Sequence, residues 1–166
     1  YRTAFVTGAS TGLGRAFAEM LLAEGVHVWC TSRDITRLAD LTQAHAGAFT
    51  PVALDLGDGA AAERAFLAAE AAARFDLVLN NAGYGVFWQF AETEFATWRE
   101  QLEVMLVNTA RLSHAALRVM LARRHGALVN ISSLAAEFPL PFQSAYNMAK
   151  AGLSALNESL MLETAG

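Results

Sequence analysis

Apolar and polar residues form two kinds of block along the chain. Short apolar runs bounded by polar residues or glycine predict five buried β-strands, at residues 3–6, 27–31, 50–54, 75–80 and 127–131. Longer segments with apolar residues at helical spacing predict helices at residues 15–22, 35–45, 59–74, 93–124 and from 144 onward. Strands that alternate with helices in this way predict an α/β fold with a parallel sheet and right-handed crossovers.

Composition narrows the class of protein. The 166 residues are 54% apolar and 17% charged, which is typical of one well-buried domain, here residues 1–166. A net charge of −4 without any Lys/Arg-rich run argues against a nucleic-acid partner, and no apolar run is long enough to span a membrane. Cys30 is the only cysteine and the histidines lack metal-ligand spacing, so we expect a cytoplasmic protein without an internal disulfide or a metal site.

A glycine-rich turn at residues 7–14 joins the first strand to the first helix. Residues without a Cβ let the backbone turn sharply and let phosphates approach its N–H groups at the positive end of a helix dipole. The turn therefore predicts a pyrophosphate-binding site made of Gly8, Ser10, Thr11, Gly12, Leu13 and Gly14.

Two other motifs overlap this turn. Residues 8–12 also fit G-x-S-x-G, the nucleophile turn of α/β-hydrolases, which would make Ser10 a nucleophile. That motif needs an earlier strand and loop for its oxyanion site and a histidine partner, and no motif supplies them. A P-loop would need lysine after its last glycine, but Leu13 follows Gly12. The dinucleotide interpretation is favoured.

Further motifs follow in order along the chain. The fourth predicted strand ends in the sequence Asn-Asn-Ala-Gly at residues 80–83, and Ser133 ends the fifth. Tyr146 comes 13 residues after Ser133, and Lys150 lies on the same helical face as Tyr146 because the two are four residues apart. With the glycine turn, these motifs make the chain resemble the short-chain dehydrogenase/reductase family over essentially its whole length.

The resemblance implies a Rossmann-type doubly wound sheet and an enzyme that interconverts a carbonyl and an alcohol. An ammonium group near a phenol favours the phenolate and lowers a pKa that is ordinarily about 10. By resemblance, Tyr146 is the general acid/base, Ser133 binds the substrate oxygen, and Lys150 holds the nicotinamide ribose. Tyr146 would then also contact the cofactor, and no metal is implied.

The resemblance also locates the rest of the cofactor site. Ser32 falls where the family places an acidic residue for the ribose, and Arg33 follows it. Because arginine binds phosphate bidentately, we expect NADP(H) to be preferred, with NAD(H) as the alternative. Asp34 is expected to cap the next helix. The remaining cofactor contacts implied by the family are Asp55, Leu56, Asn81, Ala82 and Gly83. Asp55 also fits an ordinary turn.

The chain departs from the family in two places. The family usually has asparagine seven residues after a tryptophan such as Trp98, and Met105 stands there. In the family this asparagine holds a water that links the lysine to solvent protons. Asn108 is three residues further on, and we expect it to fill this role in part if the helix is locally distorted. The family also continues beyond Gly166 with another helix and two strands, so the C-terminal strands are absent from this chain. We therefore expect the natural protein to be longer.

These features are compatible with two functions, and they also suggest which partners the protein has. The favoured one is an NADP-dependent oxidoreductase acting on a small carbonyl or alcohol, and the alternative is an NADP-binding regulator with little or no catalysis. A homodimer or homotetramer is expected through the long helix at 95–124 and the Tyr146 helix. The aromatic loop at residues 84–92 is expected to border the substrate pocket or, alternatively, to cover the sheet end as core.

Overall fold

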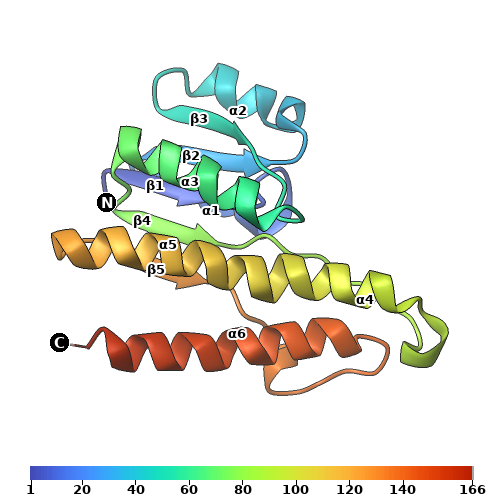
Figure 1. Ribbon diagram of the computed structural model, residues 1–166. Helices are drawn as coiled ribbons and strands as arrows, with labels where there is room; N and C mark the ends of the chain where they lie inside the picture. The colour runs from blue at the N-terminus through green and yellow to red at the C-terminus, as the bar shows by residue number, and fades with distance from the viewer. Residues whose placement is uncertain (166) are drawn as a thin grey trace.

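A computed structural model describes residues 1–165. Its centre is one parallel sheet with the strand order β3-β2-β1-β4-β5 (Figure 1). The order reverses between β1 and β4, as the predicted doubly wound topology requires. The strands are β1 (Thr3–Val6), β2 (His27–Ser32), β3 (Phe49–Ala53), β4 (Leu77–Asn80) and β5 (Ala127–Asn130).

Helices join successive strands and cover both faces of the sheet (Figure 1). One apolar core lies between the sheet and α1 and α2, with Val6, Leu22 and Leu38 buried in it. A second core, built around Phe5, Phe66 and Leu112, lies between the opposite face and α3 and α5. The α-helices are α1 (Gly12–Ala23), α2 (Ala39–Ala44), α3 (Gly59–Ala73), α4 (Phe95–Leu102), α5 (Asn108–Arg123) and α6 (Ser144–Glu163).

The predicted strands and helices are all present, with changed bounds. Asp34 caps a 3₁₀ turn, Ile35–Leu38, by accepting a hydrogen bond from the Thr36 N–H, and α2 follows it. The predicted helix at 35–45 is therefore divided, because Leu38 leaves the helical backbone region at φ −110° and ψ 5°.

The long predicted helix at 93–124 contains a feature that periodicity did not indicate. A π-helical segment, Glu103–Val107, connects α4 to α5, and Met105 lies within it. A π segment adds one residue to a helical turn and changes which side chains face the sheet beyond it. Buried residues on both sides, among them Trp98 and Leu112, show that this helical run keeps an apolar face along its length.

Candidate active site

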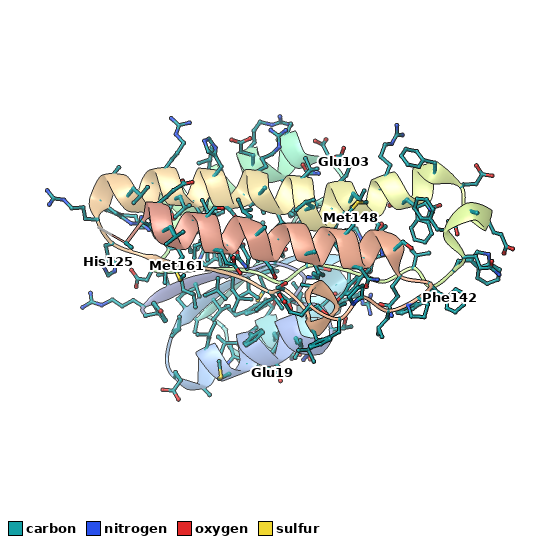
Figure 2. All side chains as sticks on the ribbon, turned by 90° about the horizontal axis from the view of Figure 1, so that it is seen from below. Glu19, Glu103, His125, Phe142, Met148 and Met161 are labelled. Atoms are coloured by element: carbon teal, nitrogen blue, oxygen red, sulfur yellow. The ribbon has the colours of Figure 1, made fainter. Side chains whose placement is uncertain are left out.

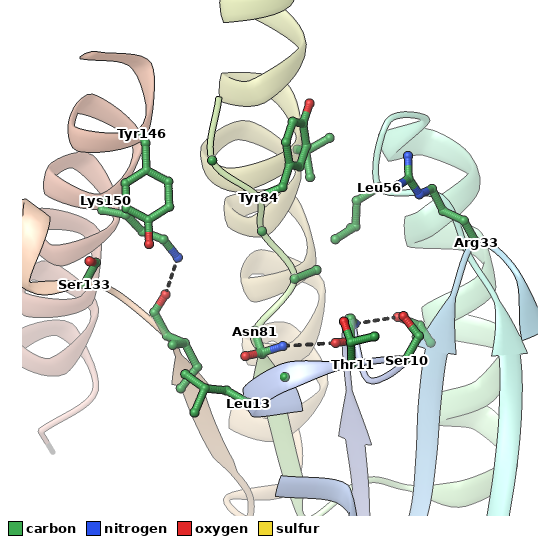
Figure 3. A pocket seen from close by; sticks show the side chains of 18 of the residues that line it. Ser10, Thr11, Leu13, Arg33, Leu56, Asn81, Tyr84, Ser133, Tyr146 and Lys150 are labelled. Atoms are coloured by element: carbon green, nitrogen blue, oxygen red, sulfur yellow. Dashed lines mark hydrogen bonds between the residues drawn. The ribbon is translucent and has the colours of Figure 1, made fainter. Parts of the chain in front are cut away.

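A cleft of about 880 Å³ opens at the carboxyl ends of the strands, beside the reversal between β1 and β4. Figure 3 shows Ser133, Tyr146 and Lys150 on one side of this cleft and Arg33 on the other, with Ser10 and Thr11 between them. Of the predicted site residues, only Gly14 and Asn108 are not among its lining. Those that line it are Gly8, Ser10, Thr11, Gly12, Leu13, Ser32, Arg33, Asp55, Leu56, Asn81, Ala82, Gly83, Ser133, Tyr146 and Lys150.

The glycine turn is built so that two of its glycines cannot be replaced without overlap. Gly8 has φ +68°, and a Cβ there would come within 2.7 Å of the Ala82 Cα. Gly14 lies so close to the Gly8 carbonyl and the Asn81 side chain that any Cβ would overlap them. The turn therefore packs directly against the segment after β4, which accounts for Gly14 being behind the cleft rather than in its lining.

The end of β4 is joined to the glycine turn by hydrogen bonds. The Asn81 amide donates to the carbonyl oxygens of Thr7 (3.1 Å) and Gly8 (3.2 Å). The Thr7 hydroxyl accepts from the backbone N–H groups of Asn81 (3.0 Å) and Ala82 (3.1 Å). Asn81 thus lines the cleft while its side chain fixes the turn in place.

The first turn of α1 meets the conditions for binding an anion. Thr11 is its N-cap but makes no side-chain capping bond, and no acidic residue lies in the first turn. Within residues 1–165, neither Ser10 nor Thr11 uses its hydroxyl in a hydrogen bond, and both side chains reach the cleft (Figure 3). The positive end of the helix dipole and free donors therefore face the same space.

The opposite side of the cleft carries two arginines. Arg33 is exposed and follows β2, whereas the buried Ser32 hydroxyl donates to the Asp34 carbonyl oxygen at 2.8 Å. Arg37 also lines the cleft, and sequence analysis missed it. Arg33 precedes the N-cap Asp34 and is not helical, so the four-residue spacing between the two arginines gave no reliable signal for Arg37.

The segment after β3 is held by local hydrogen bonds and by one bond from α5. The Asp55 carboxylate accepts from the Gly57 N–H at 2.8 Å, as in an ordinary turn. The buried Asn108 amide donates to the Leu56 carbonyl at 2.8 Å, and its side chain packs against Gly59. The structure therefore does not bring Asn108 together with Ser133, Tyr146 and Lys150.

Of the two adjacent serines after β5, only one is free to serve a ligand. The Ser132 hydroxyl lies 2.7 Å from the Ser154 hydroxyl and 3.1 Å from the Lys150 carbonyl oxygen, both on α6. The Ser133 oxygen accepts from the Ala135 N–H at 3.1 Å, which leaves its own hydrogen available to donate. Ser132 thus attaches α6 to the sheet end, and Ser133 faces the cleft (Figure 3).

Lys150 lies buried beneath Tyr146, one turn further along α6. Its ammonium group donates to the Ile131 carbonyl at 2.6 Å and lies 5.7 Å from the centroid of the Tyr146 ring. Burial lowers the pKa of Lys150. The arrangement holds a cation next to a phenol at a fixed position, which suits proton transfer at the phenol oxygen.

Met105 reaches the same place from the π segment. A Cβ built on Gly83 would lie 3.1 Å from the Met105 sulfur and 3.8 Å from the Lys150 nitrogen. A thioether is only a weak acceptor, so Met105 offers packing rather than a hydrogen bond at this point. The residue at the family's asparagine position therefore does lie close to Lys150.

The two interpretations of the aromatic loop have different outcomes. Tyr84 and Phe87 line the cleft, but Phe87, Trp88 and Phe90 are exposed, so their interpretation as core is wrong. The hydrolase alternative gains no support, since no histidine among residues 1–165 lines the cleft around Ser10.

Residues 1–165 hold no cluster of three His, Cys, Asp or Glu side chains arranged to bind a metal. None of their helices has both the length and the apolar character needed to cross a membrane.

Comparisons with known proteins all identify the same family. Residues 2–166 match the family model described as short chain dehydrogenase. A short chain dehydrogenase of Pseudocercospora fijiensis is 33% identical over 99% of this chain and 55% of its own length. A crystal structure of a short-chain dehydrogenase from Streptomyces avermitilis matches with a TM-score of 0.95 and 36% identity, over 99% of this chain and 61% of that one. A metagenomic short-chain oxidoreductase in complex with NADP matches with a TM-score of 0.91 and 34% identity, over 98% of this chain and 76% of that one. The chain thus spans little more than half the length of the Pseudocercospora protein.

Proposed function

The chain belongs to the short-chain dehydrogenase/reductase family, and on this premise we propose that it is an NADP(H)-dependent oxidoreductase that interconverts a carbonyl and an alcohol. One observation carries the proposal. Ser133, Tyr146 and Lys150 converge at one end of a cleft whose floor is the glycine turn and whose other end holds Arg33. A dinucleotide laid along this cleft would bring its reactive ring to the Tyr146 end.

The residues present fit such a cofactor. The pyrophosphate would lie on the first turn of α1, where Ser10 and Thr11 have free hydroxyls and the glycine backbone leaves room. Arg33 and Arg37 supply two guanidinium groups for a ribose 2′-phosphate at the adenosine end, which supports NADP(H) over NAD(H). When bound, the nicotinamide supplies the hydride chemistry, and the protein supplies position and charge.

The residues at the Tyr146 end of the cleft would bind the substrate oxygen and transfer the proton. The Ser133 hydroxyl would donate to the substrate carbonyl oxygen, since its hydrogen is not used within the protein. The Tyr146 phenol would give a proton to that oxygen in reduction and take it back in oxidation. Lys150 would favour the phenolate, and its burial below Tyr146 keeps its charge close to the phenol.

A carbonyl panel with NADPH tests this function. We expect wild-type protein at its natural length to oxidise NADPH in the presence of ketones or aldehydes, followed by loss of nicotinamide absorbance. NADH should support slower turnover. NADPH binding without turnover of any carbonyl or alcohol would contradict the oxidoreductase proposal.

One observation favours a second function. Met105 places a thioether beside Lys150 where the family has an asparagine amide, and methionine is a poor partner for an ordered water. If that water carries protons to Lys150, its loss would leave an NADP-binding regulator with weak catalysis. Met105→Asn distinguishes the two, because it should raise turnover strongly only if proton supply limits the wild-type protein.

We also propose that two copies associate through α4, α5 and α6. Figure 2 shows α5 and α6 side by side across one face of the molecule, with Met148 and Met161 on α6. Exposed apolar side chains lie on this helical layer: Val107, Leu121, Met148, Met161 and Leu162. Sedimentation of the wild-type protein and of Met148→Glu tests this, since a charge in the contact should shift the dimer to monomer. A cytoplasmic location stays a prediction.

A further inference from the structure

The wall around the Tyr146 end of the cleft carries large exposed apolar side chains. If Ser133 and Tyr146 hold the reacting oxygen, the body of the substrate must extend over the side chains next to them. These include Leu134, Leu140 and Phe87, which are 80%, 54% and 64% exposed and all line the cleft. Exposed apolar side chains gathered at one place in this way mark an interaction or ligand-binding surface.

Two loops present this apolar wall, one after β4 and one after β5. The Trp88 backbone N–H donates to the Phe142 carbonyl oxygen at 3.0 Å and so joins the loops to each other. Beside this bond Phe87, Trp88, Pro141 and Phe142 enclose a second hollow of about 360 Å³, completed by Gln89 and Glu92. Phe87 lines both spaces, so the hollow continues the apolar wall of the cleft.

The backbone at Phe142 adds a separate observation. Its φ of +65° lies in the left-handed region, which is unfavourable for a bulky aromatic residue. Strained conformations of this kind concentrate at ligand-binding sites, because there the strain places a side chain where function needs it. The Phe142 ring is 55% exposed at the hollow and does not stabilise a core in compensation.

The charges at this end of the cleft disfavour anionic substrates. The charged residues that line the cleft follow β2 and β3, apart from Glu100 beside Tyr84 and Lys150, whose ammonium group donates to Ile131. In the second hollow the only charged group is Glu92, whose carboxylate would repel a phosphate or a carboxylate. Among residues 1–165, no arginine or free lysine lines the wall formed by Leu134, Leu140 and Phe87.

We propose that the substrate is an uncharged ketone or aldehyde with a bulky aromatic or alkyl group, and that this group lies on Phe87 and reaches the hollow at Trp88 and Phe142. This inference rests on the proposed function for the position of the reacting oxygen. A ketose or a sugar phosphate would place most of its hydroxyls, or its charge, against these apolar rings, at a cost in binding free energy.

The test compares three carbonyl compounds with NADPH: a small aliphatic ketone, a naphthyl ketone and a ketose. We expect kcat/KM for the naphthyl ketone to exceed that for each of the others at least tenfold. Phe87→Ala and Phe142→Gly should reduce the ratio of kcat/KM for the naphthyl ketone to kcat/KM for the small ketone at least fivefold. Glycine tolerates the left-handed backbone, so Phe142→Gly removes the ring without adding strain. The matched control is Phe138→Ala, because Phe138 is an exposed loop phenylalanine that lines neither space.

Binding is measured separately by the fluorescence of Trp88, with Trp88→Phe as the blank. Quenching by the naphthyl ketone without turnover of any compound would retain the apolar site and remove the oxidoreductase assignment. Turnover of the ketose at the naphthyl rate or above, or turnover without quenching, would overturn the inference while the proposed function stands. The inference is also overturned if the Phe variants change the oligomeric state or melting temperature but not selectivity, since the loops would then hold another part of the protein.

Discussion

At the glycine-turn end of the cleft, hydrogen bonds join segments far apart in the chain, whereas at the Tyr146 end the outer walls are exposed apolar side chains. Asn81 and Thr7 bind the end of β4 to the end of β1 through four hydrogen bonds. The side chains of Phe87, Leu134 and Leu140 lie exposed on two loops, which a backbone hydrogen bond from Trp88 to Phe142 joins to each other. The first end is shaped before any ligand arrives, and the second offers an apolar surface that gains stability when it is covered.

This difference teaches where specificity resides. A pre-shaped backbone site binds one constant group, such as a pyrophosphate, whatever the substrate is. An apolar wall on two loops selects by shape and hydrophobicity and can change without affecting the core. Changes at the two ends should therefore have separable effects on cofactor binding and on turnover.

The largest expected effect separates chemistry from cofactor binding. Tyr146→Phe keeps the ring and removes the proton donor, so turnover should fall about 100- to 10,000-fold. NADPH affinity should change little, because the phosphate-binding end is untouched. Tyr84→Phe is the matched control, since Tyr84 lines the same cleft but lies away from Ser133 (Figure 3). Equal losses in both variants would show that the tyrosines act through packing.

Gly8 tests whether the glycine-turn end is rigid. Gly8→Ala adds a left-handed penalty of about 1–2 kcal/mol and an overlap with Ala82 besides. Gly12→Ala is the matched control, because Gly12 has φ +60° but open space at its Cβ position. Gly8→Ala should therefore lower the melting temperature clearly more than Gly12→Ala. Equal shifts would mean that the turn yields to the extra carbon.

Arg33 tests what this end recognises. Arg33→Ala should weaken NADPH binding by about 1.5–3 kcal/mol, the value of a charge-assisted hydrogen bond, and leave NADH binding nearly unchanged. Arg118→Ala serves as control, since Arg118 is exposed on α5 and does not line the cleft. Calorimetric titration with both cofactors measures the difference. If both cofactors weaken alike, Arg33 does not contact a 2′-phosphate.

Replacing Asn108 should give the smallest effect, and it distinguishes a structural role of this residue from a catalytic one. Asn108→Ala leaves the Leu56 carbonyl without its donor, which should lower the free energy of unfolding by about 1–3 kcal/mol. The pH profile of turnover should keep its shape, because the Asn108 amide faces Leu56. Urea unfolding and pH–rate profiles measured on the same variant check both statements. A profile that shifts while stability is retained would instead restore Asn108 to the proton pathway.

Much of this arrangement could be predicted from the sequence. The alternation of strands and helices predicted a parallel sheet with helices on both faces, and the family resemblance predicted its doubly wound order, which the structure has. Tyr146, Lys150 and Ser133 were assigned by resemblance to the family, whose motif has these residue types at these spacings, and all three line the cleft. These are local patterns, and local patterns determine local geometry.

Tertiary contacts set the remaining features. The π segment at Glu103–Val107 changes which side chains face the sheet, and the apolar periodicity does not reveal it. The sequence therefore could not predict that the Asn108 amide binds the Leu56 carbonyl. The Ser132 hydroxyl is occupied by α6, which no spacing in the sequence indicates. The exposure of Phe87 and Trp88 depends on how two loops meet. Their hydrophobicity alone was compatible with a pocket wall and with a core, and could not distinguish the two.

The transfer of deuterium from reduced NADP tests the central claim most directly. Wild-type protein is supplied with NADPH carrying deuterium at the transferable position and with an aryl ketone, and the alcohol is analysed by mass spectrometry. The account predicts one deuterium on the carbinol carbon, formed by the wild type and at least 100-fold more slowly by Tyr146→Phe. Alcohol without deuterium, no alcohol at all, or equal rates in the two proteins would contradict it.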